Sequence, residues 1–509
     1  MKTNTTKLTK EIIAFAHIFI LLLLFQAGFW AFVGSVNSAD VQGYTTVAMV
    51  SLAVGAGFVI FSIKHIGDTV STFIFAVLLM FGATLQATLD NISRYALFII
   101  ISVFFMLAAF VAVDLFVKKE FIEKYRKVTL IALAAVSVGI MGILVLFGTG
   151  EDGTKSWLMF GSFSVQLTEF LKPLFACFMT VIFASRYLSD KSKLIYGTVL
   201  MCALGLFMLY IGEMGTLLVL AFVYVVMAFL FIKNRKLLCA YLLLIVVAVA
   251  VLALAIGFVN KNFAESENGL ILKVHHVAER LVGRWNAYVR PEDYRDSYAY
   301  QVLDAQKAMA KGGLLGSNTN LWVYSFESDM IFPYILMRLG IIVGLLVIGA
   351  FTVFYLRTQR FIAMQKDIYK YAFDIALMSI IMMQTMIIAF GSLNFIPLTG
   401  IPMPLLSAGG TAMMINVAMF GLLIRESFQK QLSTVELMKK FRSARDSQRN
   451  NPVRKINGKR KIIRETAQMP DHTDSPEEQL VSQDSLFTET PALKAENTET
   501  AEKAESAVS

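Results

Sequence analysis

Long apolar stretches are the feature that most constrains this chain. A helix needs about 20 apolar residues to cross a bilayer, and the sequence holds about twelve stretches of that length. Backbone groups in hydrocarbon must be hydrogen-bonded within their own segment, so these stretches are expected to be helices. We predict an all-α, polytopic membrane helix bundle with spans near Ile12–Val33, Tyr44–Ile63, Thr69–Leu89, Tyr95–Val117, Val128–Phe147, Leu167–Ala184, Leu194–Ile211, Leu217–Ile232, Leu237–Val259, Met330–Leu356, Tyr371–Phe390 and Ser407–Ile424.

The composition supports this class. Of 509 residues, 56% are hydrophobic and 16% are charged, against about 25% charged in a soluble domain. The net charge of +9 is typical of basic cytoplasmic loops in a membrane protein, so we expect no nucleic-acid partner. The three cysteines lie in or beside apolar stretches, and their spacing indicates neither a zinc site nor a disulfide framework.

Basic residues alternate between the connections and predict the orientation. They precede the first span and fill the connections around 118–127, 186–193, 233–236 and 357–370. Because basic loops stay in the cytoplasm, we predict that these connections and both termini are cytoplasmic. The stretch 260–329 is then a long extracellular loop.

The tail, 430–509, changes character. Residues 430–464 are basic, whereas 465–509 are acidic and rich in Glu, Thr and Ser. Neither half has enough apolar residues to fold alone, so we predict a disordered cytoplasmic tail. Its basic half would contact anionic membrane lipids; the alternative is a solvated tail without a function.

Two polar stretches flank spans on the predicted outer side. Gln166, Glu169 and Lys172 are spaced to share a helix face. Charges entering lipid need a partner or a polar cavity, so they are either a structural Glu169–Lys172 pair or a cavity wall. Trp157 would anchor the interface. Glu213 begins a break between two spans, which is either a polar crevice or a tight turn.

Two further stretches are too polar or too irregular to be ordinary spans. In the long loop, Asp293 and Asp296 lie among arginines that include Arg290. They form either plain ion pairs or a general base beside cations that bind an anionic leaving group. A short helix is predicted from Gln301 to Lys311, and glycines stop it. Prolines and glycines make 394–411 irregular, and such a segment must be shielded or line a cavity.

These stretches together resemble the SEDS family, the FtsW, RodA and SpoVE peptidoglycan glycosyltransferases. Thr399–Thr411 reads TGIPMPLLSAGGT, similar to the family's TGIPLPFISYGGS. Lys155–Lys172 resembles its RRWI…GG…QPSEFAK, although Ser156, Leu167 and Thr168 depart from it. Glu213–Thr216 resembles DLGT, and Ser328–Phe332 resembles TDFIF. The family has ten spans, so this chain would carry two extra spans at its N-terminus.

The resemblance implies a reaction and a site. The family joins lipid II, a disaccharide-pentapeptide on undecaprenyl pyrophosphate, into glycan strands, beside a class B penicillin-binding protein. An aspartate of the long loop is essential in a DPxxDP-like run, but here Arg290 and Tyr294 occupy the matching positions. A small local shift would restore the carboxylate, first as Asp293, then as Asp296. The implied catalytic set is Asp293, Asp296 and Asp329; the implied substrate-binding set is Trp157, Gln166, Glu169, Lys172, Glu213, Arg290, Gln301, Ser407, Gly409 and Gly410.

The implied organisation and the alternatives complete the prediction. Residues 1–127 would hold the N-terminal spans, 128–429 the glycosyltransferase core, and 430–509 the tail. No cofactor is expected beyond a divalent cation that would hold the pyrophosphate, and its ligands are not identified. The alternatives are a catalytically weak scaffold that regulates the penicillin-binding protein, or a flippase for a lipid-linked sugar. The implied location is the bacterial cytoplasmic membrane.

Overall fold

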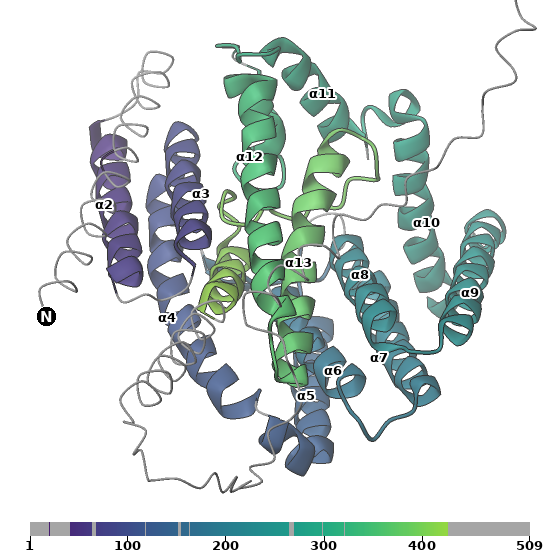
Figure 1. Cartoon of the computed structure of the whole chain (residues 1–509). Helices are drawn as coiled ribbons and strands as arrows, with labels where there is room; N and C mark the ends of the chain where they lie inside the picture. Colours follow the sequence, from purple (N-terminus) through teal and green to yellow (C-terminus); the bar gives the residue numbers. More distant parts are fainter. Residues whose placement is uncertain are drawn as a thin grey trace, which may run out of the picture. The chain divides into compact units, whose positions relative to one another are not determined.

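The fold is a bundle of long helices (Figure 1). The computed structural model describes residues 20, 41–63, 68–117, 119–150, 154–161, 163–263, 269–297, 299–319 and 321–425. The elements in chain order are α2 (Val41–Ile63), α3 (Thr69–Thr88), α4 (Ile92–Phe116), α5 (Lys119–Phe147), β1 (Trp157–Phe160), β2 (Phe163–Gln166), α6 (Thr168–Phe183), α7 (Asp190–Ile211), α8 (Met214–Phe231), α9 (Arg235–Asn262), α10 (Gly269–Val289), η2 (Pro291–Tyr294), α11 (Tyr300–Gly312), α12 (Ile331–Ala363) and α13 (Ile368–Ser392). A last helix spans Gly410–Arg425.

The helices confirm a polytopic membrane protein. Among the described residues, 8 helices are long and apolar enough to cross a membrane, and two shorter apolar helices cover Thr46–Phe58 and Gly410–Arg425. Every predicted span within the described residues coincides with a helix. Apart from residue 20, the predicted span Ile12–Val33 lies outside the described residues, as does the predicted tail 430–509.

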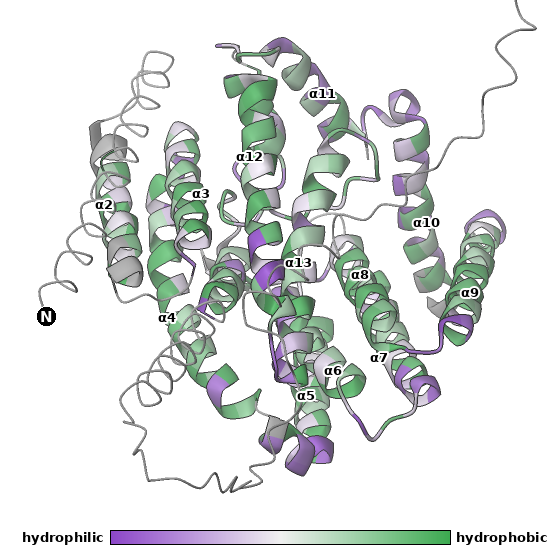
Figure 2. Cartoon of the chain, in the orientation of Figure 1, coloured by the Kyte–Doolittle hydropathy of each residue, from purple (hydrophilic) through white to green (hydrophobic). Residues whose placement is uncertain are grey.

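Some elements were not predicted from the sequence. The long connection between α9 and α12 contains the helix α10 in addition to the predicted short helix, which is α11. Residues 157–166 form an antiparallel hairpin, in which Trp157 pairs with Gln166. Figure 2 shows why α10 escaped a search for spans, because polar and apolar residues alternate along it.

The connections separate the bundle into two ends. At one end, which we call the basic end, the Asp190 side chain accepts hydrogen bonds from the backbone N–H groups of Lys233 and Asn234, both at 2.9 Å. Arg186 reaches Glu123 there at 2.7 Å. At the long-loop end, the Gln86 amide at the close of α3 donates to two backbone carbonyls, those of Glu327 and Leu406, each at 3.0 Å.

The core of the bundle lies around α3, α13 and the Gly410–Arg425 helix. α13 contacts α5, α6, α8, α11 and α12, whereas α9 packs mainly against α10. The apolar stretch of α9 is entirely unburied within the chain, and that of α13 is largely buried. Lipid would therefore solvate α9, which is apolar along its length in Figure 2.

A kink in α12 explains the glycines after α11. Gly340 has φ 82°, which interrupts the helix and frees backbone groups. The turn after α11 supplies their partners, because the N–H of Ile341 donates to Gly313 O at 3.0 Å and that of Ser317 donates to Met337 O at 2.9 Å. A Cβ on Gly316 would lie 2.1 Å from Arg338 O. These glycines therefore pack α11 against α12.

Candidate functional site

A cavity of about 1090 Å³ opens at the long-loop end. Four connections line it: α5 to α6, α7 to α8, α9 to α12, and α13 to the last helix. Helices that alternate in direction return every second connection to the same end, so residues far apart in sequence meet here. The polar lining includes Gln166, Glu213, Arg284, Asp296, Asp329 and Thr399.

The predicted irregular segment is observed over 394–409, up to the start of the last helix, and it forms one wall of this cavity. Residues 401–408 are buried, and the backbone N–H of Ala408 donates to Glu327 O at 2.8 Å in the stretch before α12. Ser407 Oγ accepts from the N–H of Met403 at 2.8 Å and donates to Ser328 O at 2.5 Å. Ser407 therefore holds the wall and does not line the cavity, whereas Gly409 does line it. Leu405 has φ 65°, a left-handed conformation that is costly for leucine.

Gln166 and Glu213 form a second wall. Gln166 Nε2 donates to Glu213 Oε1 at 2.9 Å, and the backbone N–H of Gln166 donates to Thr411 Oγ1 at 3.0 Å. Trp157 lies opposite Gln166 in the hairpin, and both line the cavity. The prediction that Gln166, Glu169 and Lys172 share a helix face is wrong, because Gln166 ends strand β2 and α6 begins only at Thr168.

Glu169 and Lys172 lie behind this wall. Lys172 Nζ is 2.6 Å from Glu169 Oε1, and the two side chains are 0% and 1% exposed. Neither residue lines the cavity. The first-turn position of Glu169 in α6 also favours a negative charge through the helix dipole. The geometry is that of a structural ion pair inside the protein, and Glu169 Oε2 has no hydrogen-bond partner among the described residues.

Asp329 is a half-buried carboxylate of the cavity. Burial raises its pKa to about 6, while hydrogen bonds act in the opposite direction, including one that Ser328 Oγ donates at 3.1 Å. A Cβ on Gly400 would lie 3.5 Å from Asp329 Oδ2, and Gly400 has φ 68°. The wall segment therefore approaches this carboxylate closely through a glycine.

The segment 290–301, which we call the rim, carries the other predicted carboxylates. Asp296 lines the cavity, as does Gln301, whose Nε2 donates to Tyr324 O at 3.4 Å. Asp293 and Arg290 are exposed and do not line it. Glu292 pairs with Arg295 on the surface. The structure thus brings Asp296 and Asp329 to one cavity and leaves Asp293 outside it.

Sequence reasoning missed several lining residues. Arg284 lines the cavity from α10, and its Nη1 donates to Gly212 O at 3.3 Å. Tyr300, Tyr324 and Ser325 also line it. Helical spacing within 269–289 would have shown that Arg280 and Arg284 share a face. For the tyrosines, nothing in the local sequence indicated a site. Gly410 is buried against Phe98 and does not line the cavity.

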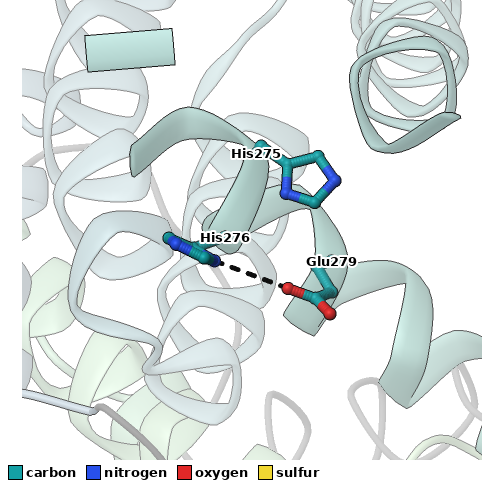
Figure 3. Close-up of side chains that lie close together, drawn as sticks. All are labelled: His275, His276 and Glu279. Carbon is teal, nitrogen blue, oxygen red and sulfur yellow. Dashed lines mark hydrogen bonds and ion pairs between the residues drawn. The ribbon is translucent and has the colours of Figure 1, made fainter. Parts of the chain in front are cut away.

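Within the part of the chain that the structure describes, the cavity does not bring three metal-ligating side chains together. Among the described residues, the one group of three close ligands is His275, His276 and Glu279 (Figure 3). None of these three lines the cavity. We therefore assign no metal to the cavity chemistry.

The described part of the chain defines a multi-pass helical membrane protein with a polar cavity at one end. A family model described as "Cell cycle protein", FtsW/RodA/SpoVE, matches residues 64–432. The chain belongs to the FtsW/RodA/SpoVE family.

Individual relatives agree with this assignment. Stage V sporulation protein E of Bacillus subtilis is 26% identical over 58% of this chain and 78% of its own length. The probable peptidoglycan glycosyltransferase FtsW of the same organism is 24% identical over 69% of this chain and 88% of its own. A solved structure described as "Structural coordination of polymerization and crosslinking by a peptidoglycan synthase complex" shares the fold, with a TM-score of 0.55, 17% identity, and coverage of 70% of this chain and 97% of that chain.

Proposed function

We propose that the chain is a peptidoglycan glycosyltransferase that polymerises lipid II at the outer face of the bacterial cytoplasmic membrane. The relative named above as a probable peptidoglycan glycosyltransferase supports the reaction. The observation that carries the proposal is that Asp296 and Asp329 line one cavity with Arg284, at the end of the bundle away from the basic connections. The basic end would be cytoplasmic, because basic loops are retained inside.

Asp296 is the proposed general base. In glycosyl transfer, a hydroxyl of the acceptor sugar attacks the anomeric carbon of the donor, and its proton must pass to a base. The bond between that carbon and the pyrophosphate oxygen then breaks, and the electron pair leaves with the pyrophosphate. Asp296 is exposed on the rim, so it can return the proton to water. A positioned base contributes about 10²–10⁴-fold to the rate.

Arg284 is the proposed partner of the leaving pyrophosphate. Pyrophosphate gains negative charge as it departs, and an adjacent guanidinium stabilises that charge by paired hydrogen bonds. Lys172, which the resemblance implied as a substrate-binding residue, is instead buried and paired with Glu169. Asp329, with Gln166 and Glu213, would accept hydrogen bonds from the sugars. In this proposal, Asp329, Gln166 and Glu213 bind the sugars, whereas Asp296 on the rim and Arg284 in α10 act in the reaction.

We further propose a class B penicillin-binding protein as partner. The solved structure that shares the fold is described as a complex that coordinates polymerisation with crosslinking.

Residues 1–63 precede the family match and would be an addition to the family core, as the predicted two extra spans imply.

A matched pair of substitutions tests the base. Purified protein in nanodiscs, with its penicillin-binding protein, is given labelled lipid II, and glycan strands are separated on a gel. Asp296→Asn should lower the polymerisation rate by about 10²-fold or more, since the base is lost. Asp293→Asn, three positions away and outside the cavity, should leave the rate within about threefold.

Each other outcome contradicts part of the proposal. An inactive Asp293→Asn with an active Asp296→Asn would move the base to Asp293. A wild-type protein that makes no glycan but activates the transpeptidase would be a scaffold. Transfer of lipid II between leaflets without polymer would indicate a flippase.

A further inference from the structure

We propose that His275, His276 and Glu279 form a binding site for a divalent transition-metal ion of the Zn²⁺ type. All three lie in α10, and one ligand atom from each lies within 4.8 Å of the others. Figure 3 shows the rings of His275 and His276 and the carboxylate of Glu279 gathered on the helix. The site is separate from the cavity, since none of the three residues lines it.

His275 supplies the strongest argument. Its side chain is only 7% exposed, and its Nε2 lies 3.1 Å from the backbone oxygen of Asn260. A carbonyl oxygen only accepts, so in the neutral ring Nε2 carries the proton and Nδ1 keeps a lone pair. Nδ1 is buried and has no hydrogen-bond partner within the described ranges. An unpaired buried polar atom is costly, and a metal ion would satisfy it.

The contact with Asn260 is itself typical of a metal ligand. A histidine that binds a metal through one nitrogen usually donates the other N–H to a carbonyl or carboxylate. That hydrogen bond fixes the tautomer and the orientation of the ring. Here it also joins α10 to the end of α9, because Asn260 belongs to α9. His275 is therefore held as a ligand before any ion binds.

His276 and Glu279 can close the site. Both side chains are exposed, and His276 Nδ1 lies 3.5 Å from Glu279 Oε2, a long contact that can be exchanged for metal bonds. Bonds of about 2.0–2.1 Å in a tetrahedral site place ligand atoms about 3.3 Å apart. The ligand atoms, which lie within 4.8 Å of one another, need to approach by up to about 1.5 Å, and water would take the fourth position.

The donor set selects the metal. Two imidazoles and one carboxylate suit Zn²⁺ and its neighbours, whereas Mg²⁺ and Ca²⁺ prefer oxygen ligands alone. The sequence did not reveal this, because the search for cysteine and histidine spacing does not detect two adjacent histidines with a carboxylate. The helix places residues three and four positions apart on one face. Binding would fix the hairpin of α9 and α10, which carries Arg284 to the cavity.

Co²⁺ is the probe, because its visible absorption reports tetrahedral coordination. The full chain is purified without a polyhistidine tag, reconstituted in nanodiscs, and titrated with Co²⁺ and then with competing Zn²⁺. Wild type should bind about one ion per chain with the intense bands of a tetrahedral site. The double variant His276→Ala/Glu279→Gln, which changes only exposed side chains, should lose these bands and at least tenfold in affinity.

Two controls make the result decisive. Glu292→Gln, which removes an exposed carboxylate of the same connection, should bind Co²⁺ as wild type does. Excess Mg²⁺ should not displace Co²⁺. Equal binding by wild type and the double variant, octahedral spectra, or displacement by Mg²⁺ would each overturn the proposal. Polymerisation activity is not the readout, so failure here leaves the proposed function untouched.

Discussion

The ion pair behind the wall of the cavity and the ion pair on its rim differ in burial. Behind the wall, Glu169 and Lys172 are almost completely buried and paired with each other. On the rim, Glu292 and Arg295 form a pair of the same i,i+3 spacing that is roughly half exposed. A buried charge depends on its partner, whereas an exposed charge is already solvated by water. The buried pair therefore stabilises the fold, whereas charged residues of the rim can take part in the reaction.

Breaking the buried pair should have the largest effect on stability. Lys172→Met leaves Glu169 charged without a partner, and it should lower the free energy of unfolding by about 3–5 kcal/mol. Thermal unfolding in detergent, followed by tryptophan fluorescence, measures the change. The double variant Glu169→Gln/Lys172→Met should recover much of the loss, since no unpaired charge remains.

Asp304 and Lys307 are the matched control for that pair. They have the same i,i+3 spacing in α11, lie 2.9 Å apart, and are about half exposed. Lys307→Met should change stability by no more than about 0.5 kcal/mol. If it destabilised the protein as much as Lys172→Met does, burial would not be the reason for the difference between wall and rim.

The pH dependence of activity sharpens the comparison at Asp329. Burial raises its pKa to about 6, so the carboxylate is ionised above this pH and protonated below it. If its charge is needed to bind the sugars, polymerisation should fall up to about tenfold per unit as the pH drops below 6. Asp329→Asn should lower activity and remove this inflection, while other inflections remain.

Stability should respond to Asp329 in the opposite direction. A carboxyl whose pKa is higher in the folded state than in the unfolded state stabilises the fold at low pH, and that contribution is lost as the pH rises through about 6. At pH 7.5, Asp329→Asn should therefore raise the free energy of unfolding by on the order of 1 kcal/mol. A destabilised variant at this pH would argue that Asp329 is a structural residue.

The rim pair should show the smallest effect. Arg295→Ala removes an exposed partner of Glu292, and we expect no resolvable change in the unfolding midpoint and less than a twofold change in polymerisation rate. A large loss of activity would instead show that Arg295 orders the rim around Asp296, which contacts the cavity from the next position in the chain.

The sequence by itself determined the class of fold. Apolar stretches of span length form helices in lipid, because the hydrocarbon offers their backbone groups no hydrogen-bond partners outside the segment. The helices α3, α9 and α13 are examples. The pattern of prolines and glycines likewise determined that 394–411 is irregular. Local rules sufficed because both effects act within a single segment of the chain.

Only the tertiary structure decided the site. The sequence favoured Asp293 over Asp296 as the base, whereas the position of the rim places Asp296 in the cavity and leaves Asp293 outside it. Gln166 lies in strand β2, paired with Trp157, and not in the helix that its spacing predicted. Its backbone N–H also donates to Thr411 Oγ1, far away in the chain. Arg284 lines the cavity because α10 places it there. A search for apolar spans does not detect α10, because the helix is of mixed polarity. These outcomes depend on contacts between distant segments, so no window of sequence contains them.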